Sequence, residues 1–505
     1  MSIAIIDAYH ALHFEVIDQI KQNNINIEYC IRGVEENYHG EKSIINQVII
    51  DSPEIQFDPI TKFLFKDNLQ VLVTSEYYLS RSVLARYAYL ENKFLRLTDR
   101  SAVLPISVHQ RVKYFQILLN YFIGIHNKYK FTHVLCFDTP HSYFSYLFYE
   151  YLKSQEVKVV RIEYHYYSDY CLVLNTPQMP LLDEDFGKNK SSTEFYNELP
   201  QNLQKSIKEG SAFVEEYTDN EAKRLVSNNI KGKIQLYIKY STKYFSNIIL
   251  GFFPSLTKKQ IRHFTGLNKI NSELHYRLSI NKNVSKLYKL QKRYRKISTH
   301  PQLNVNYAFY AMHMQPEKTT LPLGEEMDHL LTSISIISNA LPEGWKLYVK
   351  EHPNQFNFKK VANVNFRDET FYSALNRFDN ITLVSINFPS KQLIKNAQIV
   401  ATLTGTVGWE ALLAGKPVLI FGDAYYKACK AVRYISDISS CKAAIKELSL
   451  MTPNDISREL YRYLSFYIKK NWLIESVNWE SKIKHSQYTR KQIVNNLTDA
   501  IIERL

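Results

Sequence analysis

Cysteine is scarce in this sequence and is not arranged as a disulfide or zinc framework. The five cysteines are Cys30, Cys136, Cys171, Cys429 and Cys441. They are odd in number, scattered and without a Cys-x-x-Cys pair, which argues against a disulfide-stapled fold and a cysteine zinc site. No Asp-rich or His-x-x-x-His spacing offers another set of metal ligands. We therefore expect no metal, no cofactor and a reducing compartment.

Long hydrophobic runs are absent as well. The longest uncharged apolar stretches, such as residues 247–256, are too short to cross a bilayer. The first residues, MSIAIIDAYHALHFEVIDQIKQ, lack the basic start of a signal peptide, and Asp7 and His10 interrupt their apolar run. The sequence shows no internal repeat and no low-complexity tract. These absences favour a soluble cytoplasmic protein.

The residues that are present are typical of a globular protein. Apolar residues make up 45% of the chain and charged residues 22%. Because 505 residues are too many for one ordinary core, two or more domains are expected. We expect α/β domains over residues 1–200 and 304–470, a basic, aromatic helical connector or insertion over 201–303, and terminal helices over 471–505 that pack back on the first domain.

The net charge of +14 is concentrated in one segment. Residues 231–300 contain 12 Lys and 4 Arg but one acid, Glu273, so the rest of the chain is close to neutral. The simplest interpretation is a solvated helical surface. A second is contact with an anionic membrane at the inner face of the cytoplasmic membrane, with residues 248–253 at the interface. No nucleic-acid partner is expected, because the charge lies in a connector and no DNA- or RNA-binding module is recognisable.

Strand and helix patterns alternate in both expected domains, which predicts mainly parallel sheets. In the first domain the strands are expected at residues 2–7, 132–137 and 157–162, and the helices at 108–129 and 143–152. In the second domain the strands are expected at 307–312, 346–350, 381–384, 398–404 and 418–422, and the helices at 327–340, 390–396 and 407–414. Residues 177–210 are polar and are expected to form a loop.

The stretch 398–426 has the pattern of a strand, a tight turn, a helix and a second strand. Thr404, Gly405 and Thr406 form the turn, in which Thr406 is expected to cap the helix and Gly405 to let a ligand approach the backbone. A helix that starts at the carboxyl end of a parallel strand directs free N–H groups and partial positive charge at a ligand, so the turn suits a phosphate. Glu410 lies one turn further on, within reach of a ribose hydroxyl. The alternative is an ordinary αβ unit without a ligand.

Three loops that follow predicted strands, at residues 313–317, 350–353 and 404–406, belong to one edge of the expected sheet, where open α/β sheets bind ligands. Lys350 and His352 would add positive charge and a hydrogen-bond donor, and Pro353 would fix the turn. Other polar residues assigned to the nucleotide are Gln315, Glu317 and Glu410, of which the two glutamates offer acceptors for a ribose or a base. An isolated His-Pro is otherwise a turn histidine, and residues 315–317 are otherwise a helix N-terminus.

Three motifs together resemble the bacterial capsule polysaccharide biosynthesis family, which includes Kdo transferases. They are KEHP at residues 350–353, TGTVGWEALLAGKPVLIFGDAYY at 404–426 and HMQPEKTTLPLG at 313–324. The His-Pro motif is also similar to that of CMP-sialic acid transferases and of teichoic-acid glycerophosphotransferases. The resemblance covers about residues 304–426 and is faint in the N-terminal half, where DTPH at 138–141 is the best candidate.

The resemblance implies a GT-B fold, in which two Rossmann-like domains face a cleft and the C-terminal one holds the donor nucleotide. It implies metal-independent transfer of a sugar from a nucleotide-activated donor, such as CMP-Kdo, to a surface or capsular glycan or glycolipid. The N-terminal domain would then bind the acceptor.

Polar residues that follow predicted strands of the N-terminal domain are the candidates for acid–base chemistry. They are Asp138, His141, Glu163 and His165, at the ends of two strands that are expected to be neighbours. A carboxylate or histidine here would deprotonate the acceptor hydroxyl, and we favour Asp138 or Glu163. Structural capping is the alternative for either residue. Asp7 and His10, after the first strand, are candidates for acceptor contacts.

Two other functions remain compatible with these motifs. A CDP-glycerol-type glycerophosphotransferase would use the same His-Pro motif and phosphate seat. A non-catalytic capsule assembly or export protein would keep a degenerate nucleotide fold, but the joint presence of Lys350, His352, Thr404, Thr406 and Glu410 argues against it. A UDP-sugar epimerase shares the two-domain plan, but its motifs are less similar.

Overall fold

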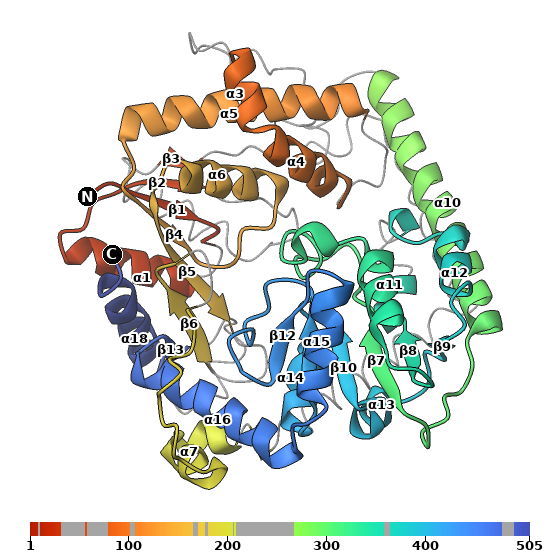
Figure 1. Cartoon of the computed structure of the whole chain (residues 1–505). Coiled ribbons are helices and arrows are strands. Elements are labelled where there is room, and N and C mark those ends of the chain that lie inside the picture. The colour runs from red at the N-terminus through yellow and green to blue at the C-terminus, as the bar shows by residue number, and fades with distance from the viewer. Residues whose placement is uncertain are drawn as a thin grey trace.

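Two α/β halves, each built on its own sheet, make up the computed structural model (Figure 1). The residues it describes are 1–8, 11–31, 56–57, 79–100, 107–164, 170–176, 180–205, 207–208, 267–357, 364–476 and 489–505. His10, His165, residues 209–266 and residues 477–488 therefore lie outside the described part of the chain. The expected fold class is confirmed, because both halves carry largely parallel sheets with helices on both faces.

The first sheet has seven strands in the order β13-β6-β5-β4-β1-β2-β3. Its strands are β1 (Ile3–Ile6), β2 (Ile27–Ile31), β3 (Gln56–Phe57), β4 (His133–Cys136), β5 (Lys158–Tyr164), β6 (Tyr170–Leu174) and β13 (Leu473–Glu475). β1 to β5 pair in parallel, whereas β6 is antiparallel to both β5 and β13. β1 and β4 are buried along their whole length, as expected for parallel strands that are covered on both faces.

Helices cover both faces of this sheet. α1 (Ala11–Gln22) and α18 (Arg490–Ile502) share a core with one face. α4 (Ala88–Arg100), α5 (Val108–Tyr129) and α6 (Tyr143–Ser154) share a core with the other, and the short α3 (Arg81–Arg86) precedes α4.

The second sheet has six parallel strands in the order β12-β11-β10-β7-β8-β9. They are β7 (Tyr307–Ala311), β8 (Lys346–Lys350), β9 (Ile381–Val384), β10 (Ile399–Thr402), β11 (Val418–Ile420) and β12 (Val432–Tyr434). From β7 the chain adds strands in one direction as far as β9, then returns to build outward from β10. This reversal is the topological switch point of an open, doubly wound sheet.

The second sheet is also covered on both faces. One core contains residues of α10 (Leu267–Ile297), α11 (Leu330–Ala340), α12 (Glu369–Leu375) and α15 (Ile438–Leu448). The other contains residues of α13 (Ser390–Asn396), α14 (Thr406–Leu413) and α16 (Pro453–Lys469). β6 and α7 (Ser192–Glu198) of the first half border the latter core, because Tyr170, Leu172 and Leu199 belong to it.

The last segment of the chain returns from the second half to the first. α16 runs toward the first half, β13 then pairs with β6, and α18 packs beside α1 (Figure 1). The sequence predicted helices here but not the strand β13. It also missed β2, β3, β6 and β12, and the expected loop at 177–210 contains α7.

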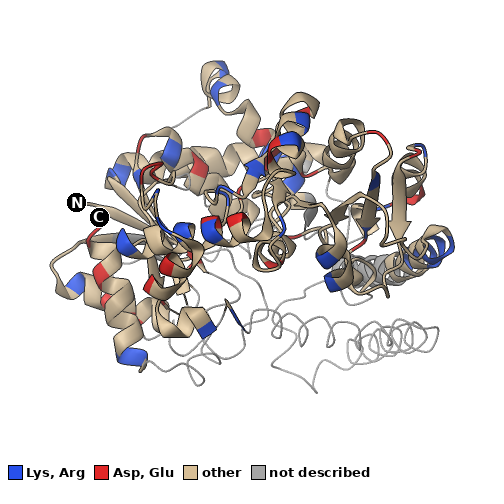
Figure 2. Ribbon diagram, turned by 60° about the horizontal axis from the view of Figure 1, so that its bottom comes forward, with Lys and Arg blue, Asp and Glu red and all other residues tan. Residues whose placement is uncertain are grey.

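Lysine and arginine are interspersed with acidic residues on both halves (Figure 2). Of the basic segment 231–300, the structure describes only the part from residue 267 onward, in which α10 forms one long helix. Within the described residues, no helix is both long and apolar enough to cross a bilayer.

Candidate functional site

The sequence-predicted residues of the second half gather where its sheet reverses direction. His313 follows β7, and the turn Thr404-Gly405-Thr406 follows β10, the neighbouring strand. Lys350 ends β8 on the other side of β7. All three strands are parallel, so the three loops meet at the carboxyl edge of the sheet, as predicted.

The turn at residues 404–406 begins helix α14, but its cap differs from the expected one. Gly405 is the N-cap residue, Thr406 is the first helical residue, and no side chain caps the helix. The expectation that Thr406 caps α14 is therefore wrong, because the helix starts one residue earlier. Since no side chain takes the first N–H groups, the cap leaves them to a ligand or to water.

Two side chains, Tyr426 and His313, contact the backbone of this turn. Tyr426 donates its hydroxyl proton to the Gly405 carbonyl oxygen. His313 Nε2 lies 3.4 Å from the backbone nitrogen of Thr404, and a Cβ atom at Gly405 would come within 3.1 Å of the same ring nitrogen. Burial first, and then the charges of His352 and Arg367, lower the pKa of His313 to about 3, so the ring is neutral. A neutral Nε2 can accept the Thr404 N–H.

Lys350, which is buried, and Glu410, which is half-buried, are oppositely charged side chains beside the turn, and each affects the pKa of the other. Lys350 is 7% exposed, and its Nζ donates to Ser390 Oγ at 2.7 Å. Burial lowers the pKa of Lys350 to about 8, and the charge of Glu410 limits that shift. Burial raises the pKa of Glu410 to about 7, and the charges of Lys391 and Lys350 limit it in turn. Both groups therefore titrate near neutral pH.

His352 and Pro353 start a short 3-10 helix, Pro353–Phe356. His352 Nδ1 accepts a hydrogen bond from the backbone N–H of Asn354 at 3.1 Å. The imidazole is thus the cap of that turn, and in the neutral ring the proton lies on Nε2, which can donate to an anion. The turn-histidine interpretation and the ligand interpretation are both compatible with this geometry.

A buried ion pair that the sequence did not reveal joins the loops after β7 and β8. Arg367 Nε donates to Glu351 Oε2 at 2.8 Å, and both side chains are almost completely buried. Arg367 also donates to Gln315 Oε1 and to the His313 carbonyl oxygen. Burial lowers the pKa of Arg367, but the Glu351 charge outweighs it and the net shift is upward. The pair fixes the loop at His313 relative to the loop at His352.

The amide of Gln315 is enclosed by this network. Its Nε2 donates to the Asp328 carbonyl oxygen at 2.7 Å, and its Oε1 accepts from Arg367. Glu317 lies further out and is half-buried, with Thr319 Oγ1 at 3.4 Å from its Oε2. Of the two, Glu317 is the more accessible to a ligand.

In the first half, the structure brings Asp138 and Glu163 together at the ends of the neighbouring strands β4 and β5. Thr139 links them, because its backbone N–H donates to Asp138 Oδ1 at 2.8 Å and its hydroxyl donates to Glu163 Oε2. His141 Nδ1 donates to the Thr139 carbonyl oxygen at 2.9 Å. Asp138 keeps 25% of its side chain exposed, whereas Glu163 is buried. The DTPH segment therefore forms one hydrogen-bonded unit.

Asp7 lies at the corresponding switch point of the first sheet, between β1 and β4. It is fully buried and adopts a φ of 60°, a left-handed backbone conformation that is uncommon outside glycine. Such conformations are often found at functional sites.

Ion pairs bridge the facing edges of the two halves. Lys318 Nζ lies 2.7 Å from Asp138 Oδ1, Arg161 Nη2 lies 3.6 Å from Asp423 Oδ2, and Lys93 Nζ lies 3.3 Å from Glu326 Oε1. Arg96 also pairs with Asp328. A small apolar cluster, Leu97, Tyr146 and Leu321, lies at the same boundary. The predicted acid–base residues and the predicted nucleotide loops thus face each other.

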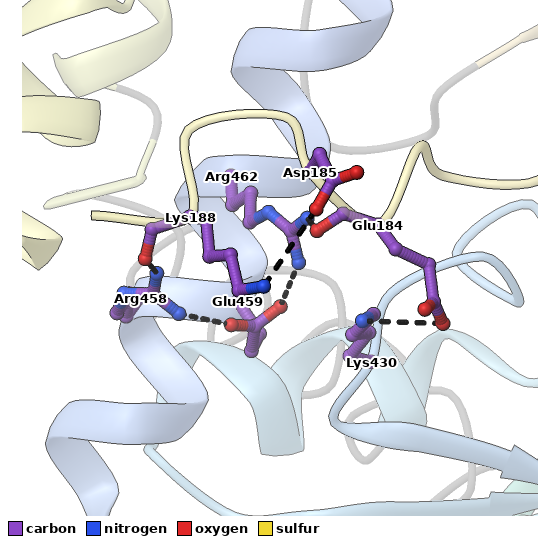
Figure 3. A pocket seen from close by; sticks show the side chains of 7 residues that line it. All are labelled: Glu184, Asp185, Lys188, Lys430, Arg458, Glu459 and Arg462. Atoms are coloured by element: carbon purple, nitrogen blue, oxygen red, sulfur yellow. Dashed lines mark hydrogen bonds and ion pairs between the residues drawn. The ribbon is translucent and has the colours of Figure 1, made fainter. Parts of the chain in front are cut away.

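A polar cavity of about 250 Å³ lies away from these loops and is lined by charged residues only (Figure 3). The lining residues are Glu184, Asp185, Lys188, Lys430, Arg458, Glu459 and Arg462. Arg458 and Arg462 of α16 already donate to backbone carbonyl oxygens of residues 183–190 and to Glu459. The cavity therefore lies where α16 packs against that loop.

No cluster of three or more potential metal-ligating side chains occurs among the described residues. The five cysteines are all buried, free thiols.

Comparison with known proteins supports the resemblance seen in the motifs. Residues 268–429 match the model of the family described as capsule polysaccharide biosynthesis protein. A curated relative, Protein FixF of Sinorhizobium fredii, is 32% identical over 87 residues, which cover 17% of this chain and 22% of the relative. The matched segment therefore spans less than a quarter of that relative.

Solved structures match this chain at low identity and low TM-score. The beta Kdo 2,7 transferase KpsC of Thermosulfurimonas dismutans matches with a TM-score of 0.30 and 11% identity, covering 75% of this chain and 88% of that one. The UDP-GlcNAc 2-epimerase of Methanocaldococcus jannaschii matches with a TM-score of 0.23 and 11% identity, covering 92% and 100%. Such values identify no substrate. The family match contains β7 to β11 and the loops described above, so residues 268–429 carry the sequence pattern of the capsule polysaccharide biosynthesis family.

Proposed function

We propose that this protein is a glycosyltransferase, which moves a sugar from a nucleotide-activated donor to a surface or capsular glycan. One observation carries the proposal: the uncapped N-terminus of α14, with Lys350 and Glu410 beside it, faces the Asp138–Glu163 unit of the other half across ion-paired edges. The match of residues 268–429 to a capsule biosynthesis family supports it.

The second half would hold the donor nucleotide. Free N–H groups at the start of α14 and the hydroxyl of Thr406 would bind its phosphate. Thr404 and Gly405 would hold the turn in place, because the Thr404 hydroxyl donates to the Thr319 carbonyl oxygen and Gly405 leaves room for the His313 ring. Lys350 would supply positive charge and His352 Nε2 a hydrogen bond to the departing nucleotide, so that the transfer proceeds without a metal.

Acidic side chains at the same edge would bind the sugar moiety of the nucleotide. Glu410 would accept from a ribose hydroxyl, and Glu317 from a ribose or base. Gln315 and Pro353 would act indirectly, because Gln315 is enclosed by Arg367 and Pro353 starts the turn that presents His352.

The first half would activate the acceptor. A carboxylate takes the proton of the acceptor hydroxyl, the acceptor oxygen forms a bond to the anomeric carbon, and the bond from that carbon to the phosphate oxygen breaks, with its electron pair leaving on the nucleotide. We assign this base to Asp138, because it is more exposed than Glu163. Glu163 and His141 would orient it through Thr139. Asp7 is fully buried and would act on the acceptor site through the residues that cover it.

Finer assignments follow the resemblance. We propose a CMP-linked sugar, such as CMP-Kdo, as the donor and a glycan or glycolipid as the acceptor, with the reaction at the inner face of the cytoplasmic membrane. Roles for His10 and His165, and membrane contact through residues 231–300, stay predictions, since most of those residues lie outside the described ranges.

Isothermal titration of CMP, CDP, UDP and GDP tests the proposal. Wild-type protein is compared with His352→Ala and with His300→Ala, an exposed histidine that contacts Phe388. We expect selective CMP binding that is lost only in His352→Ala. A preference for CDP would favour glycerophosphate transfer, and a preference for UDP or GDP would contradict the CMP-linked donor. The absence of any binding would overturn the nucleotide site and favour an assembly protein.

A further inference from the structure

A lysine of the second half contacts the proposed base of the first half. Lys318 lies in the loop after β7, and its Nζ donates to Asp138 Oδ1 at 2.7 Å. The lysine keeps 14% of its side chain exposed and the aspartate 25%, so the pair is largely withdrawn from water. The Lys318 ammonium group is thus hydrogen-bonded to an oxygen of Asp138, the carboxylate that is proposed to take the proton from the acceptor hydroxyl.

The same loop is tied to the proposed phosphate seat. Thr404 Oγ1 donates to the carbonyl oxygen of Thr319, the residue after Lys318, at 2.7 Å. Further along the loop, the Asp423 N–H donates to the Leu323 carbonyl oxygen at 2.8 Å. The backbone next to Lys318 is therefore fixed to the turn that starts α14, while the lysine side chain extends to the opposite half.

A lysine side chain can exchange oxygen partners without backbone movement. Its ammonium is a compact charge with three donors on a flexible four-carbon stem. A phosphate bound at residues 404–406 would bring a second anion to the loop that carries Lys318. The two anions, carboxylate and phosphate, would then compete for one ammonium.

We propose that Lys318 is a donor-responsive residue: it holds Asp138 in an ion pair while the site is empty and transfers to the donor phosphate when the nucleotide binds. This inference rests on the proposed function and adds an order to it, because the base becomes available only after the donor has bound. The ammonium stays protonated throughout and neutralises part of the charge that develops on the departing phosphate.

The electrostatics around Asp138 agree with this exchange. Burial raises the pKa of Asp138, but the charges of Lys318 and His141, with the hydrogen bonds from Lys318 and Thr139, outweigh it and hold the pKa below its usual value. Glu163 is linked to Asp138 through Thr139. Departure of Lys318 removes the strongest of the lowering effects, so Asp138 becomes a stronger base.

Lys93 provides a matched control within the same boundary. It pairs with Glu326 across the two halves at 3.3 Å, but neither partner belongs to the proposed site. Loss of this pair reports the effect of removing one cross-boundary lysine without touching Asp138.

The test is a double-mutant cycle on nucleotide affinity. The nucleotide that binds wild type most tightly is titrated against Lys318→Met, Asp138→Asn, the double variant and Lys93→Met. We expect Lys318→Met to weaken binding about tenfold, as for the loss of one hydrogen bond between charged groups. Asp138→Asn is expected to tighten binding several-fold, because the competing carboxylate is gone, and to have no effect in the Lys318→Met background. Lys93→Met is expected to bind like wild type.

Three results would overturn the exchange. Equal tightening by Asp138→Asn with and without Lys318 would mean that the carboxylate acts by plain repulsion of the nucleotide. Unchanged affinity in Lys318→Met, when His352→Ala abolishes binding, would reject this inference and leave the proposed function standing. Failure of wild type to bind any of the four nucleotides would reject both. Lys318→Gln, which keeps a donor without the charge, serves as a second variant if Lys318→Met is poorly folded.

Discussion

At the residue scale, the shifted pKa values of Lys350 and Glu410 make the site sensitive to pH. The pKa of Glu410 is about 7 against an ordinary value of 4.5, and that of Lys350 is about 8 against 10.5. Both charges are therefore present together only in a narrow range around pH 7 to 8. A phosphate next to Lys350 would favour the charged ammonium and widen that range.

The effect of the raised Glu410 pKa on the free energy of unfolding can be measured directly. Between about pH 4.5 and 7 the folded chain keeps the Glu410 proton while the unfolded chain releases it, so the contribution of this group to stability falls as pH rises. Glu410→Gln lacks this titration. We predict that its free energy of unfolding, relative to wild type, increases by about 1–3 kcal/mol from pH 5 to pH 8, as measured by urea unfolding.

Glu447 supplies the control of opposite sign. Its hydrogen bond to Arg433 holds its pKa below the usual value, so its carboxylate favours the folded state as pH rises. This titration lies at and below the ordinary value of 4.5, so the difference in stability between Glu447→Gln and wild type is expected to stay nearly constant from pH 5 to pH 8. A Glu410→Gln variant that is equally insensitive to pH would contradict the burial argument.

At the scale of a single element, the position of α14 depends on Gly408, which leaves room for the Tyr426 side chain. A Cβ atom at Gly408 would lie 2.2 Å from the Tyr426 hydroxyl and 2.7 Å from its ring, which no side-chain rotation of alanine can relieve. That hydroxyl bonds the Gly405 carbonyl oxygen at the start of the same helix. Close approach of Tyr426 under α14 therefore determines where the turn sits.

We predict that Gly408→Ala displaces Tyr426, lowers the free energy of unfolding by about 1–3 kcal/mol and weakens nucleotide binding. Gly124→Ala, in α5, is the matched control, because no other atom lies within 4 Å of the added methyl group. That substitution is expected to stabilise the protein by up to about 1 kcal/mol through helix propensity. Thermal unfolding and nucleotide titration of both variants test this prediction. Unchanged nucleotide binding in Gly408→Ala would mean that Tyr426 does not determine the position of the phosphate-binding turn.

The unit around α14 was predictable because its signals are local. An apolar strand, a small-residue turn, strong helix formers and Gly415 occur within 25 consecutive positions, and Gly415 indeed takes a φ of 67° just after the helix. The site around it was less predictable. Arg367 pairs with Glu351, 16 positions earlier in the sequence, and Lys318 pairs with Asp138, 180 positions earlier. No sequence pattern around Arg367 or Lys318 indicates which residue it will contact in the fold. β13 was missed for the same reason, since it is three residues long and its partner β6 lies about 300 positions earlier.

At the scale of the whole molecule, α16 connects the two halves. Its apolar residues Ile456, Leu460 and Tyr463 share one core with Tyr170 of β6 and with strands of the second sheet. Its polar side binds the loop at residues 183–190, through the arginines drawn in Figure 3. The relative position of the halves therefore depends on this helix as well as on the ion pairs at their boundary.

Arg462 is the central contact of that helix with the loop. It is 3% exposed and donates to the carbonyl oxygens of Asp183, Glu184 and Phe186 at 2.6–2.8 Å, and to Glu459 at 3.1 Å. Arg462→Met keeps an unbranched apolar side chain but leaves those acceptors unpaired, so we predict a loss of about 2–4 kcal/mol in the free energy of unfolding. Arg433→Met, which removes a more exposed pair with Glu447, is expected to cost less than about 1 kcal/mol. Urea unfolding compares the two variants, and equal losses would mean that the loop is held by apolar packing alone. Because Arg462 lies outside the nucleotide loops, folded Arg462→Met is expected to bind CMP about as tightly as wild type. Such a result would show that Arg462 stabilises the contact between the halves without contributing to donor binding.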